Sequence, residues 1–256
     1  MEFGICYLNY IAIRNDPSDH SEMVSQLLFG ETFHVLQEDG LWIKIHMDYD
    51  FYEGWVLKNQ VLELSEETYK KVTLTDPYFS DELITFINDK DEHPQILTLG
   101  AGLPEFKNGH FILDDFNYAF EGDVITGKQK KANLVHTAYK FLNAPFLWGG
   151  RTPFGVDCSG FTQMVYKING YQLFRDAHQQ ASQGEVLSFI EECEPGDLAF
   201  FDNEEGEIIH TGIVLDNNYI IHCNGKVRID RIDSSGIYNV DTKRHTHKLR
   251  VMKQLF

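Results

Sequence analysis

The sequence has few cysteines, few prolines and no long apolar run, and each shortage excludes a class of protein. Its 256 residues include four cysteines, Cys6, Cys158, Cys193 and Cys223, with no CxxC spacing. Neither a disulfide framework nor a thiolate zinc site is expected from such a set. No stretch approaches the roughly 18 apolar residues of a membrane span. With seven prolines and 43% hydrophobic residues, the chain is typical of a soluble globular protein.

Positive charge is also scarce. The chain carries 22 Lys and Arg against 39 Asp and Glu, a net charge of −17. Such a chain repels nucleic acid, anionic lipid and anionic wall polymers, and it favours cationic ligands. We therefore expect no nucleic-acid partner and no membrane partner. A monomer is expected, although the sequence does not determine the oligomeric state.

The first residues, "MEFGICYLNYIAIRNDPS", have no basic segment and no small-residue cleavage site. This favours a cytoplasmic location, and a periplasmic or secreted one fits only if a leader has been trimmed.

Three domains are expected along the chain. Residues 1–64 contain short alternating segments such as "FHVLQ" and "LWIKIHM", divided by polar turns, which predicts a small all-β barrel or sandwich. Residues 65–127 are more polar, with a short helix expected near residues 80–88 followed by short strands. "LTLGAGLPEF" loosely echoes "SQLLFGETFHVL", so this stretch is either a second barrel of the same kind or a linker β domain.

Residues 128–256 predict helices first and antiparallel strands afterwards, which is an α+β plan. The run "KQKKANLVHTAYKFLN" has apolar residues at helical spacing and is stopped by Pro145. A second helix is expected to begin at Asp157 or Cys158 and to end at Gly170. From Pro195 onward the pattern is β.

Cys158 lies where a glycine-rich loop gives way to that second helix, within "WGGRTPFGVDCSGF". A helix N-terminus favours thiolate, and its free backbone N–H groups can hold an oxyanion. A cysteine nucleophile also needs a base and a group that orients the base.

His210 and His222 supply that pair. They lie twelve residues apart on either side of the turn "DNN", so both face the same side of a hairpin and lie about 5 to 8 Å apart. One imidazole can face the thiol while the other holds it, as in a cysteine-histidine triad. A zinc site on these residues lacks a further ligand at suitable spacing, so no metal and no cofactor are expected. The run "KRHTHK" is interpreted as a solvated strand edge.

Four segments, "FLWGGRTPFGVDCSGFTQMVY", "EPGDLAFFD", "HTGIVL" and "YIIHCNG", resemble the NlpC/P60 family of papain-like cysteine peptidases. The resemblance implies that Cys158 is the nucleophile, His210 the general base and His222 the orienting residue. The front of the chain, with its closing "GWV", is similar to bacterial SH3 (SH3b) domains. The expected architecture is thus an SH3b domain, a second SH3b-like or linker domain, and an NlpC/P60 domain.

This combination resembles γ-D-glutamyl-L-diamino acid endopeptidases of the dipeptidyl-peptidase VI type. The resemblance implies cleavage of the γ-D-Glu–diamino acid bond in murein peptides that have a free N-terminal L-Ala, during recycling of cell-wall peptides. The diamino acid, L-lysine or meso-diaminopimelate, stays open.

The resemblance also implies a set of residues that bind the substrate. Tyr52 of the SH3b domain is expected to reach the active site, and Asp157 is expected to hold the substrate amine, with either Asp16 or Glu22 as a second acidic partner. The resemblance places Arg175 and Asp176 near the substrate. From the residues themselves, Trp148 is expected to line the cleft, and Ser159 is expected to contact the substrate through its backbone N–H at the oxyanion hole.

Three alternatives keep the same sequence features. The Cys-His-His core also suits an amidase or acyltransferase. A hydrolase that remodels intact peptidoglycan is the second alternative. A wall-binding module with an inactive peptidase domain is the third, and the intact Cys158, His210 and His222 argue against it.

Overall fold

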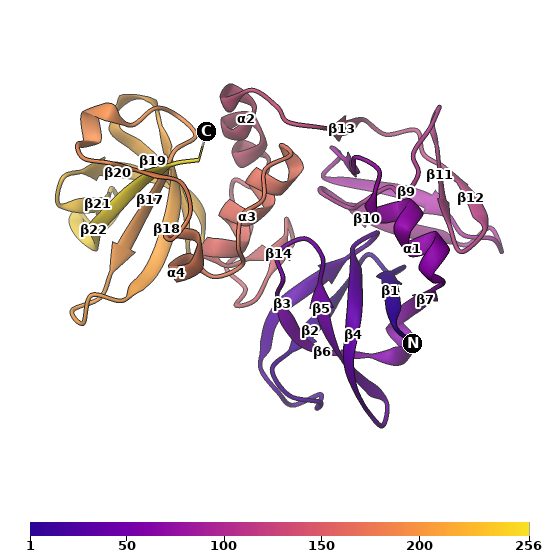
Figure 1. Cartoon of the computed structure of the whole chain (residues 1–256). Coiled ribbons are helices and arrows are strands. Elements are labelled where there is room, and N and C mark those ends of the chain that lie inside the picture. Colours follow the sequence, from indigo (N-terminus) through magenta and orange to yellow (C-terminus); the bar gives the residue numbers. More distant parts are fainter. Residues whose placement is uncertain (256) are drawn as a thin grey trace. The chain divides into compact units, whose positions relative to one another are not determined.

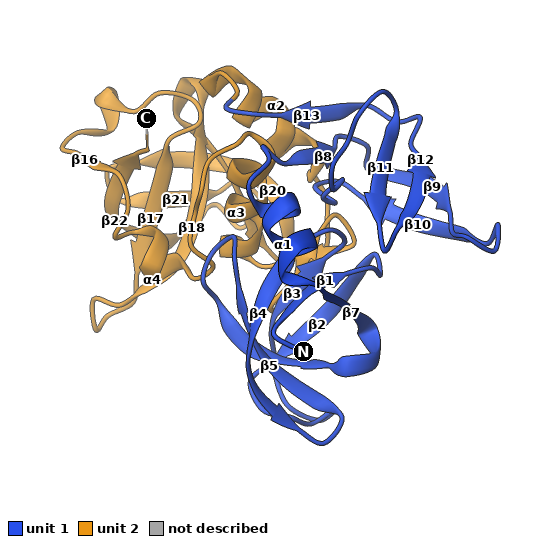
Figure 2. Cartoon of the chain, turned by 45° about the vertical axis from the view of Figure 1, so that its right-hand side comes forward, with its two compact units in different colours: residues 1–128 blue, residues 129–256 orange. Residues whose placement is uncertain are grey.

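The computed structural model describes residues 1–255 and divides the chain into two compact units, Met1–Lys128 and Gln129–Phe256. Figure 2 colours the two units, and each is described here by itself. None of the helices within residues 1–255 combines the length and apolar character that are needed to cross a bilayer.

Unit 1 opens with a seven-stranded antiparallel sheet in the order β3-β2-β6-β5-β4-β1-β7 (Figure 1). Buried and half-buried residues alternate along β5, as expected when one face of a strand covers a core. That core includes Ile13, Phe33 and Val56. The elements are β1 Phe3–Cys6, β2 Tyr10–Arg14, β3 Met23–Leu28, β4 Thr32–Asp39, β5 Trp42–Met47, β6 Glu53–Leu57, η1 Lys58–Gln60 and β7 Val61–Leu64.

The expectation of a helix near residues 80–88 is wrong. That segment contains strand β9, Ile84–Asn88, which pairs with β10, Pro94–Thr98, and buries Ile87. Its apolar residues Leu83, Ile84, Phe86 and Ile87 have helical spacing, but over so short a stretch the pairing with β10 outweighs that local pattern. The helix of this region is α1, Glu66–Thr73, whose N-cap Ser65 accepts a hydrogen bond from the Thr68 N–H.

The rest of unit 1 consists of three two-stranded ladders rather than one continuous sheet. Besides β9 and β10 they are formed by β8 Tyr78–Ser80, β11 His110–Leu113, β12 Phe116–Ala119 and β13 Val124–Thr126. Their buried residues, such as Leu97 and Phe111, share one core with Ile5 and Phe29 of the first sheet. The two halves of unit 1 therefore stabilise each other through a common hydrophobic core.

Unit 2 has the α+β plan expected from the sequence. Its helices are α2 Lys131–Lys140, α3 Cys158–Ile168 and α4 Ala177–Gln180. Helix α2 ends before Pro145, and α3 is followed by Gly170 in the left-handed conformation, φ 81°. Nearly every residue of α3 is buried, because it packs against α2 on one side and against β18 and β19 on the other (Figure 1).

The sheet of unit 2 has the order β16-β22-β17-β18-β19-β20-β21, and β21 also pairs with β22. Six strands therefore form a closed ring around a core that includes Phe201, Ile220 and Ile237. The elements are β14 Arg151–Thr152, β15 Gly155–Val156, β16 Glu185–Leu187, η2 Ile190–Glu192, β17 Leu198–Asp202, β18 Ile208–Leu215, η3 Asp216–Asn218, β19 Tyr219–Asn224, β20 Lys226–Asp233, β21 Gly236–Asn239 and β22 Arg244–Gln254.

Two glycines bring the loop before α3 against the first turn of that helix. A Cβ atom on Gly160 would lie 2.2 Å from the carbonyl oxygen of Gly150, and a Cβ on Gly150 would lie 2.3 Å from that of Gly155. Both contacts are with backbone, which cannot rotate away. The position of α3 relative to the loop thus depends on the absence of these side chains.

This close approach reverses the usual effect of alanine in a helix. Alanine is normally favoured over glycine by about 1 kcal/mol, but Gly160→Ala is expected to destabilise unit 2 by about 1–3 kcal/mol because the loop has to move. In scanning calorimetry the Tm of one transition should fall by about 3–10 °C. The control Gly206→Ala adds a Cβ where no atom lies within 4 Å, so any loss of Tm there reports only the strain of its left-handed φ of 82° and not a steric contact. An unchanged or higher Tm for Gly160→Ala would contradict the packing described.

Candidate active site

Cys158 is the first residue of α3, and the preceding Asp157 caps the helix. The Asp157 backbone is extended, and its side chain accepts a hydrogen bond of 2.6 Å from the Gly160 N–H. This is the ordinary N-cap arrangement for aspartate, and it fixes the helix start one residue before the cysteine. The predicted start of the second helix is confirmed.

The Asp157 carboxylate is also held by a buried arginine. Arg175 donates to both carboxylate oxygens, at 3.0 and 2.6 Å, and to the Ser159 hydroxyl at 3.0 Å. The Gly149 N–H donates to the second oxygen at 2.9 Å. Arg175 is 1% exposed and Asp157 is 5% exposed. These contacts give both residues a structural task, and their roles toward a substrate stay predictions.

The Cys158 thiol lies against the backbone of strand β18. The N–H groups of Thr211 and Ser159 both act on the sulfur as hydrogen-bond donors. The pairing of β18 with β19 begins at Gly212, so the Thr211 N–H lies just beyond that ladder. Among the described residues no hydrogen bond joins the Cys158 thiol to His210, whose chain neighbour Thr211 contacts the sulfur instead.

The helix N-terminus is not the only influence on the charge of the Cys158 thiol. Burial raises the pKa of the Cys158 thiol to about 12, and the negative charge of Asp157 adds to the effect. The Thr211 N–H, the charge of Arg175 and the Ser159 N–H lower the pKa, but by less. A helix N-terminus lowers the pKa of a thiol, but here desolvation raises the pKa by more than the helix lowers it. The resting nucleophile is therefore a neutral thiol.

His210 and His222 lie side by side, as the spacing predicts. His210 Nε2 is 2.9 Å from His222 Nδ1, and the two rings are nearly perpendicular. Gly212 pairs directly with His222, so His210 is the diagonal neighbour on the same face of the hairpin. A Cβ on Gly212 would lie 2.8 Å from the His222 Cβ. The missing side chain thus leaves room for the His222 ring to reach His210.

Sequence reasoning missed the next member of this chain. His222 Nε2 is 3.0 Å from a carboxylate oxygen of Asp230, and Arg228 donates to both oxygens of that carboxylate, at 2.7 and 3.0 Å. The segment "HCNGKVRID" contains the evidence for this contact. Arg228 and Asp230 are two residues apart in the next strand, and both lie on the face of the sheet that carries His222. Without the register of β19 and β20, that face could not be assigned.

Burial keeps the histidine pair neutral. Desolvation, together with the nearby His222 and His247, lowers the pKa of His210 well below its ordinary value. Desolvation also lowers the pKa of His222, against the opposing effect of Asp230. Burial alone would raise the pKa of Asp230, but hydrogen bonds from His222 and Arg228 outweigh it and lower the pKa to about 2. The site thus contains a neutral imidazole pair ending at an ionised carboxylate.

A third histidine belongs to the same cluster. His247 of β22 stacks on His210, with ring centroids 4.1 Å apart and planes 24° apart. It is half-buried, and desolvation lowers its pKa to about 4. The interpretation of "KRHTHK" as a solvated edge is therefore wrong at His247, because closure of the ring between β21 and β22 brings this residue over the site.

The remaining predicted residues are distributed over both units. In unit 2, Trp148 is 60% exposed in the glycine-rich loop, and the Asp176 N–H donates to the Gln179 side chain at the start of α4. In unit 1, Tyr52 packs against the barrel core, and Asp16 and Glu22 are exposed in the loop between β2 and β3. The substrate-binding roles of all these residues stay predictions.

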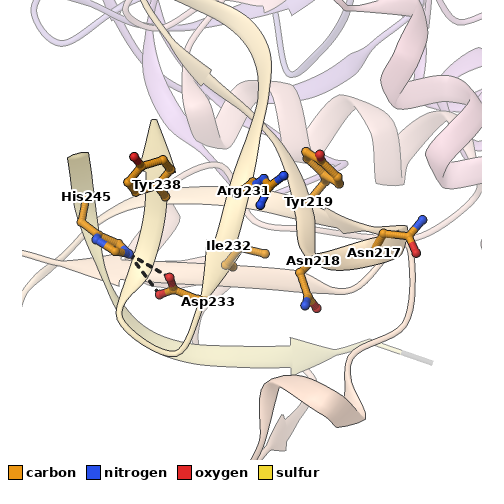
Figure 3. Close-up of a pocket in the computed structure, with 8 residues that line it drawn as sticks. All are labelled: Asn217, Asn218, Tyr219, Arg231, Ile232, Asp233, Tyr238 and His245. Carbon is orange, nitrogen blue, oxygen red and sulfur yellow. Dashed lines mark hydrogen bonds and ion pairs between the residues drawn. The ribbon is translucent and has the colours of Figure 1, made fainter. Parts of the chain in front are cut away.

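Two other features of the described residues invite a ligand. Asp89, Asp91 and His93 of unit 1 place three possible metal ligands within reach of one ion, on an exposed turn. In unit 2 a groove lies beside η3, β20 and β21, and Figure 3 shows the residues that line it, with Asp233 bonded to His245. Neither feature includes Cys158, His210 or His222.

Comparison with known proteins places this geometry in a family. The model of the NlpC/P60 family matches residues 143–247, and that of the bacterial dipeptidyl-peptidase Sh3 domain matches residues 13–61. A γ-D-glutamyl-L-lysine dipeptidyl-peptidase of Bacillus subtilis is 31% identical over 215 residues, which cover 77% of this chain and 71% of that protein. The chain belongs to the NlpC/P60 family. It is accordingly a cysteine peptidase.

Further relatives agree with this membership. A protein of the same name from Bacillus cereus is 26% identical and covers 79% of this chain and 67% of its own length. The crystal structure of an NlpC/P60 family protein from Bacillus cereus matches with a TM-score of 0.83 at 17% identity, covering 99% of both chains. An NlpC/P60 endopeptidase from Photobacterium damselae matches with a TM-score of 0.75 at 17% identity, covering 97% of this chain and 70% of that one. At these identities the two structures show the fold.

The stacked ring of His247 should control the titration of His210. Because burial is the main cause of the lowered pKa of His210, that residue should stay neutral as the pH falls through 6.5 and gain a proton only at lower pH. His247→Ala exposes the ring and should raise the pKa of His210 toward 6.5. NMR titration of the imidazole Cε1–H signals measures both values.

His247→Phe is the matched variant, because it keeps an aromatic ring over His210. It should leave the pKa of His210 closer to the wild-type value than His247→Ala does. A His210 pKa at or above 6.5 in the wild type, or equal shifts in both variants, would contradict the role of burial.

Proposed function

We propose that this peptidase hydrolyses the γ-D-glutamyl–diamino acid bond of murein-derived peptides that carry a free N-terminal L-Ala, and that it serves the recycling of such peptides in the cytoplasm. The observation that carries the proposal is the hydrogen bond between His210 of β18 and His222 of β19, together with the contact of the Cys158 thiol with the backbone of Thr211, the residue after His210. The names of the Bacillus relatives, γ-D-glutamyl-L-lysine dipeptidyl-peptidases, supply the bond type.

The first half of the reaction forms a thioester. Cys158 transfers its thiol proton to His210 Nδ1 while the sulfur attacks the γ-carbonyl carbon of D-Glu. The proton moves together with the attack, because burial disfavours each charged group alone. Backbone N–H groups at the start of α3 stabilise the oxyanion. His210 then gives the proton to the leaving amine of the diamino acid, and the C–N bond breaks.

The second half releases the dipeptide. Water loses a proton to His210 and attacks the thioester carbonyl, and the C–S bond then breaks as the sulfur regains that proton. His222 keeps the His210 ring in one orientation through both halves, because its Nδ1 lies 2.9 Å from His210 Nε2. No cofactor enters this scheme.

Selectivity for a free N-terminus follows from charge. An ammonium group is a cation, and the chain has a net charge of −17. Asp157 and either Asp16 or Glu22 are the acidic groups proposed to hold the amine, with Tyr52, Ser159 and Trp148 lining the cleft. An acylated N-terminus lacks the positive charge that these carboxylates attract, so it should bind less well.

A direct assay tests the bond and the amine requirement together. The protein is incubated with L-Ala-γ-D-Glu-meso-diaminopimelate, with the L-lysine analogue, and with N-acetyl forms of both, and the products are read by mass spectrometry. Release of L-Ala-γ-D-Glu from the free-amine peptides alone is expected. Equal cleavage of the acetylated peptides would overturn the recycling role and favour a hydrolase of intact peptidoglycan. No cleavage of any peptide would favour an amidase or acyltransferase.

The nucleophile and the base are tested by substitution. Cys158→Ala and His210→Ala should each lower kcat by at least about 10⁴-fold without unfolding the protein, because the two groups act as one unit. Cys193→Ala is the matched control, since this second cysteine of unit 2 contacts Met252 rather than the histidines. It should keep the wild-type kcat. Full activity in Cys158→Ala would exclude the mechanism.

A further inference from the structure

We propose that Asp230, held in place by Arg228, is a positioning residue that sets the tautomers of both histidines and thereby gives His210 its basic nitrogen. The inference rests on the proposed function in one respect, the role of His210 as the base. None of the four sequence segments that carry the family resemblance contains Asp230. This residue lies on β20, one strand beyond His222.

The Asp230 carboxylate is buried and accepts four hydrogen bonds. One oxygen accepts from His222 Nε2 at 3.0 Å and from Arg228 Nε at 2.7 Å. The other accepts from an Arg228 terminal nitrogen at 3.0 Å and from the Val240 N–H at 3.0 Å. Asp230 itself is 0% exposed. Because the arginine and the amide can only donate, the carboxylate can only accept, and it does so as the ionised group.

The protons of the two histidines follow from this one fact. An ionised carboxylate offers no proton, so His222 Nε2 must carry the hydrogen of the His222–Asp230 bond. Since His222 is neutral, its Nδ1 has a free lone pair and accepts from His210 Nε2–H at 2.9 Å. His210 is neutral as well, so its remaining nitrogen, Nδ1, has the lone pair. That is the nitrogen that takes the thiol proton in the mechanism.

Strand register delivers the three side chains in a regular step. His222 pairs with Gly212 on one neighbouring strand and with Arg228 on the other. His210 lies two residues before Gly212, and Asp230 lies two residues after Arg228. Each hydrogen bond therefore joins diagonal neighbours on one face of the sheet, across β18, β19 and β20. A one-residue slip of either pairing would turn a member to the opposite face.

Arg228 makes the buried charge tolerable. It forms an ion pair with Asp230 at 2.7 Å and reaches a second carboxylate, Asp241, at 2.8 Å. A buried carboxylate without such a partner would be expensive. The titratable and charged groups against the histidine pair are thus His247 from β22 and Asp230 with Arg228 from β20, while Cys158 of α3 lies against the backbone of Thr211, next to His210. Besides His210, the ionised carboxylate is the only group that forms a hydrogen bond with the His222 ring among the described residues.

Asp230→Asn tests the proposal because it keeps the shape and removes the charge. If the amide NH₂ group faces His222, then Nε2 loses its hydrogen, Nδ1 gains it, and His210 is forced into the Nδ1–H tautomer that cannot accept the thiol proton. The expected result is a kcat about 10–100-fold lower with KM changed less than about 2-fold. The KM should change little because Asp230 is fully buried and cannot contact the substrate.

The same strand offers a matched control. Asp233 also binds a histidine, His245, at 2.9 Å, but this pair lies at the exposed groove of Figure 3 and touches neither catalytic histidine. Asp233→Asn should leave kcat unchanged. Equal kcat values for Asp230→Asn, Asp233→Asn and the wild type would overturn the proposal.

A measurement on the unmodified protein keeps the test independent of folding and of activity. ¹⁵N NMR of histidine-labelled protein near neutral pH should show His210 and His222 both protonated at Nε2, with signals assigned from His→Gln variants. Protonation of His222 at Nδ1 would overturn the proposal even if Asp230→Asn fails to fold. If the tautomers are as expected but no γ-D-glutamyl peptide is cleaved, the proposed function fails and the positioning role stands.

Discussion

The Asp157 carboxylate joins the segments that surround the nucleophile. It caps α3 through the Gly160 N–H, holds the glycine-rich loop through the Gly149 N–H, and binds Arg175 through both oxygens. All of these donors converge on one buried group, so the loop, the helix start and the segment before α4 cannot shift independently. Cys158 is the first residue of α3 because the Asp157 side chain caps the helix at the position before it.

Unit 2 therefore contains two buried carboxylates with opposite effects on the reaction. Asp157 lies beside the thiol, and its charge adds to the burial that keeps the sulfur protonated. Asp230 lies at the far end of the histidine chain and makes the imidazole next to the thiol a better-defined base. Each carboxylate is matched by its own arginine, Arg175 or Arg228. Desolvation and the charge of Asp157 together favour the protonated sulfur.

Much of this site could be predicted from the sequence, because its signals are local. A glycine-rich loop before an apolar-periodic segment predicts a helix that starts at Cys158, and an even spacing across a short turn predicts that His210 and His222 share a face. Asp230 and His247 could not be found in this way. Their places depend on the register of β19 with β20 and on the pairing of β21 with β22, which are long-range properties. The raised pKa of the Cys158 thiol could not be predicted in this way either, because the desolvation that causes it is a tertiary property.

The same contrast between local and long-range order applies to the first unit. The alternation along β5 predicts a barrel strand, whereas five residues at Ile84–Asn88 fit both a helix and a strand until their partner β10 is known. The SH3-like part was recognisable from its closing "GWV". The three ladders of residues 78–126 had no such marker, since they are defined by the core that they share with the first sheet.

The closure of the unit 2 ring also completes the surroundings of the base. Strand β22 pairs with β16, β17 and β21, and it also brings His247 over His210. The nucleophile, by contrast, belongs to a helix whose start is fixed by its own neighbours in the chain. Loss of the β22 pairing would therefore remove the stacked ring from His210 but leave the helix cap at Cys158 unchanged. The surroundings of the base thus depend on long-range strand pairing, whereas the place of the nucleophile in its helix depends on a local cap.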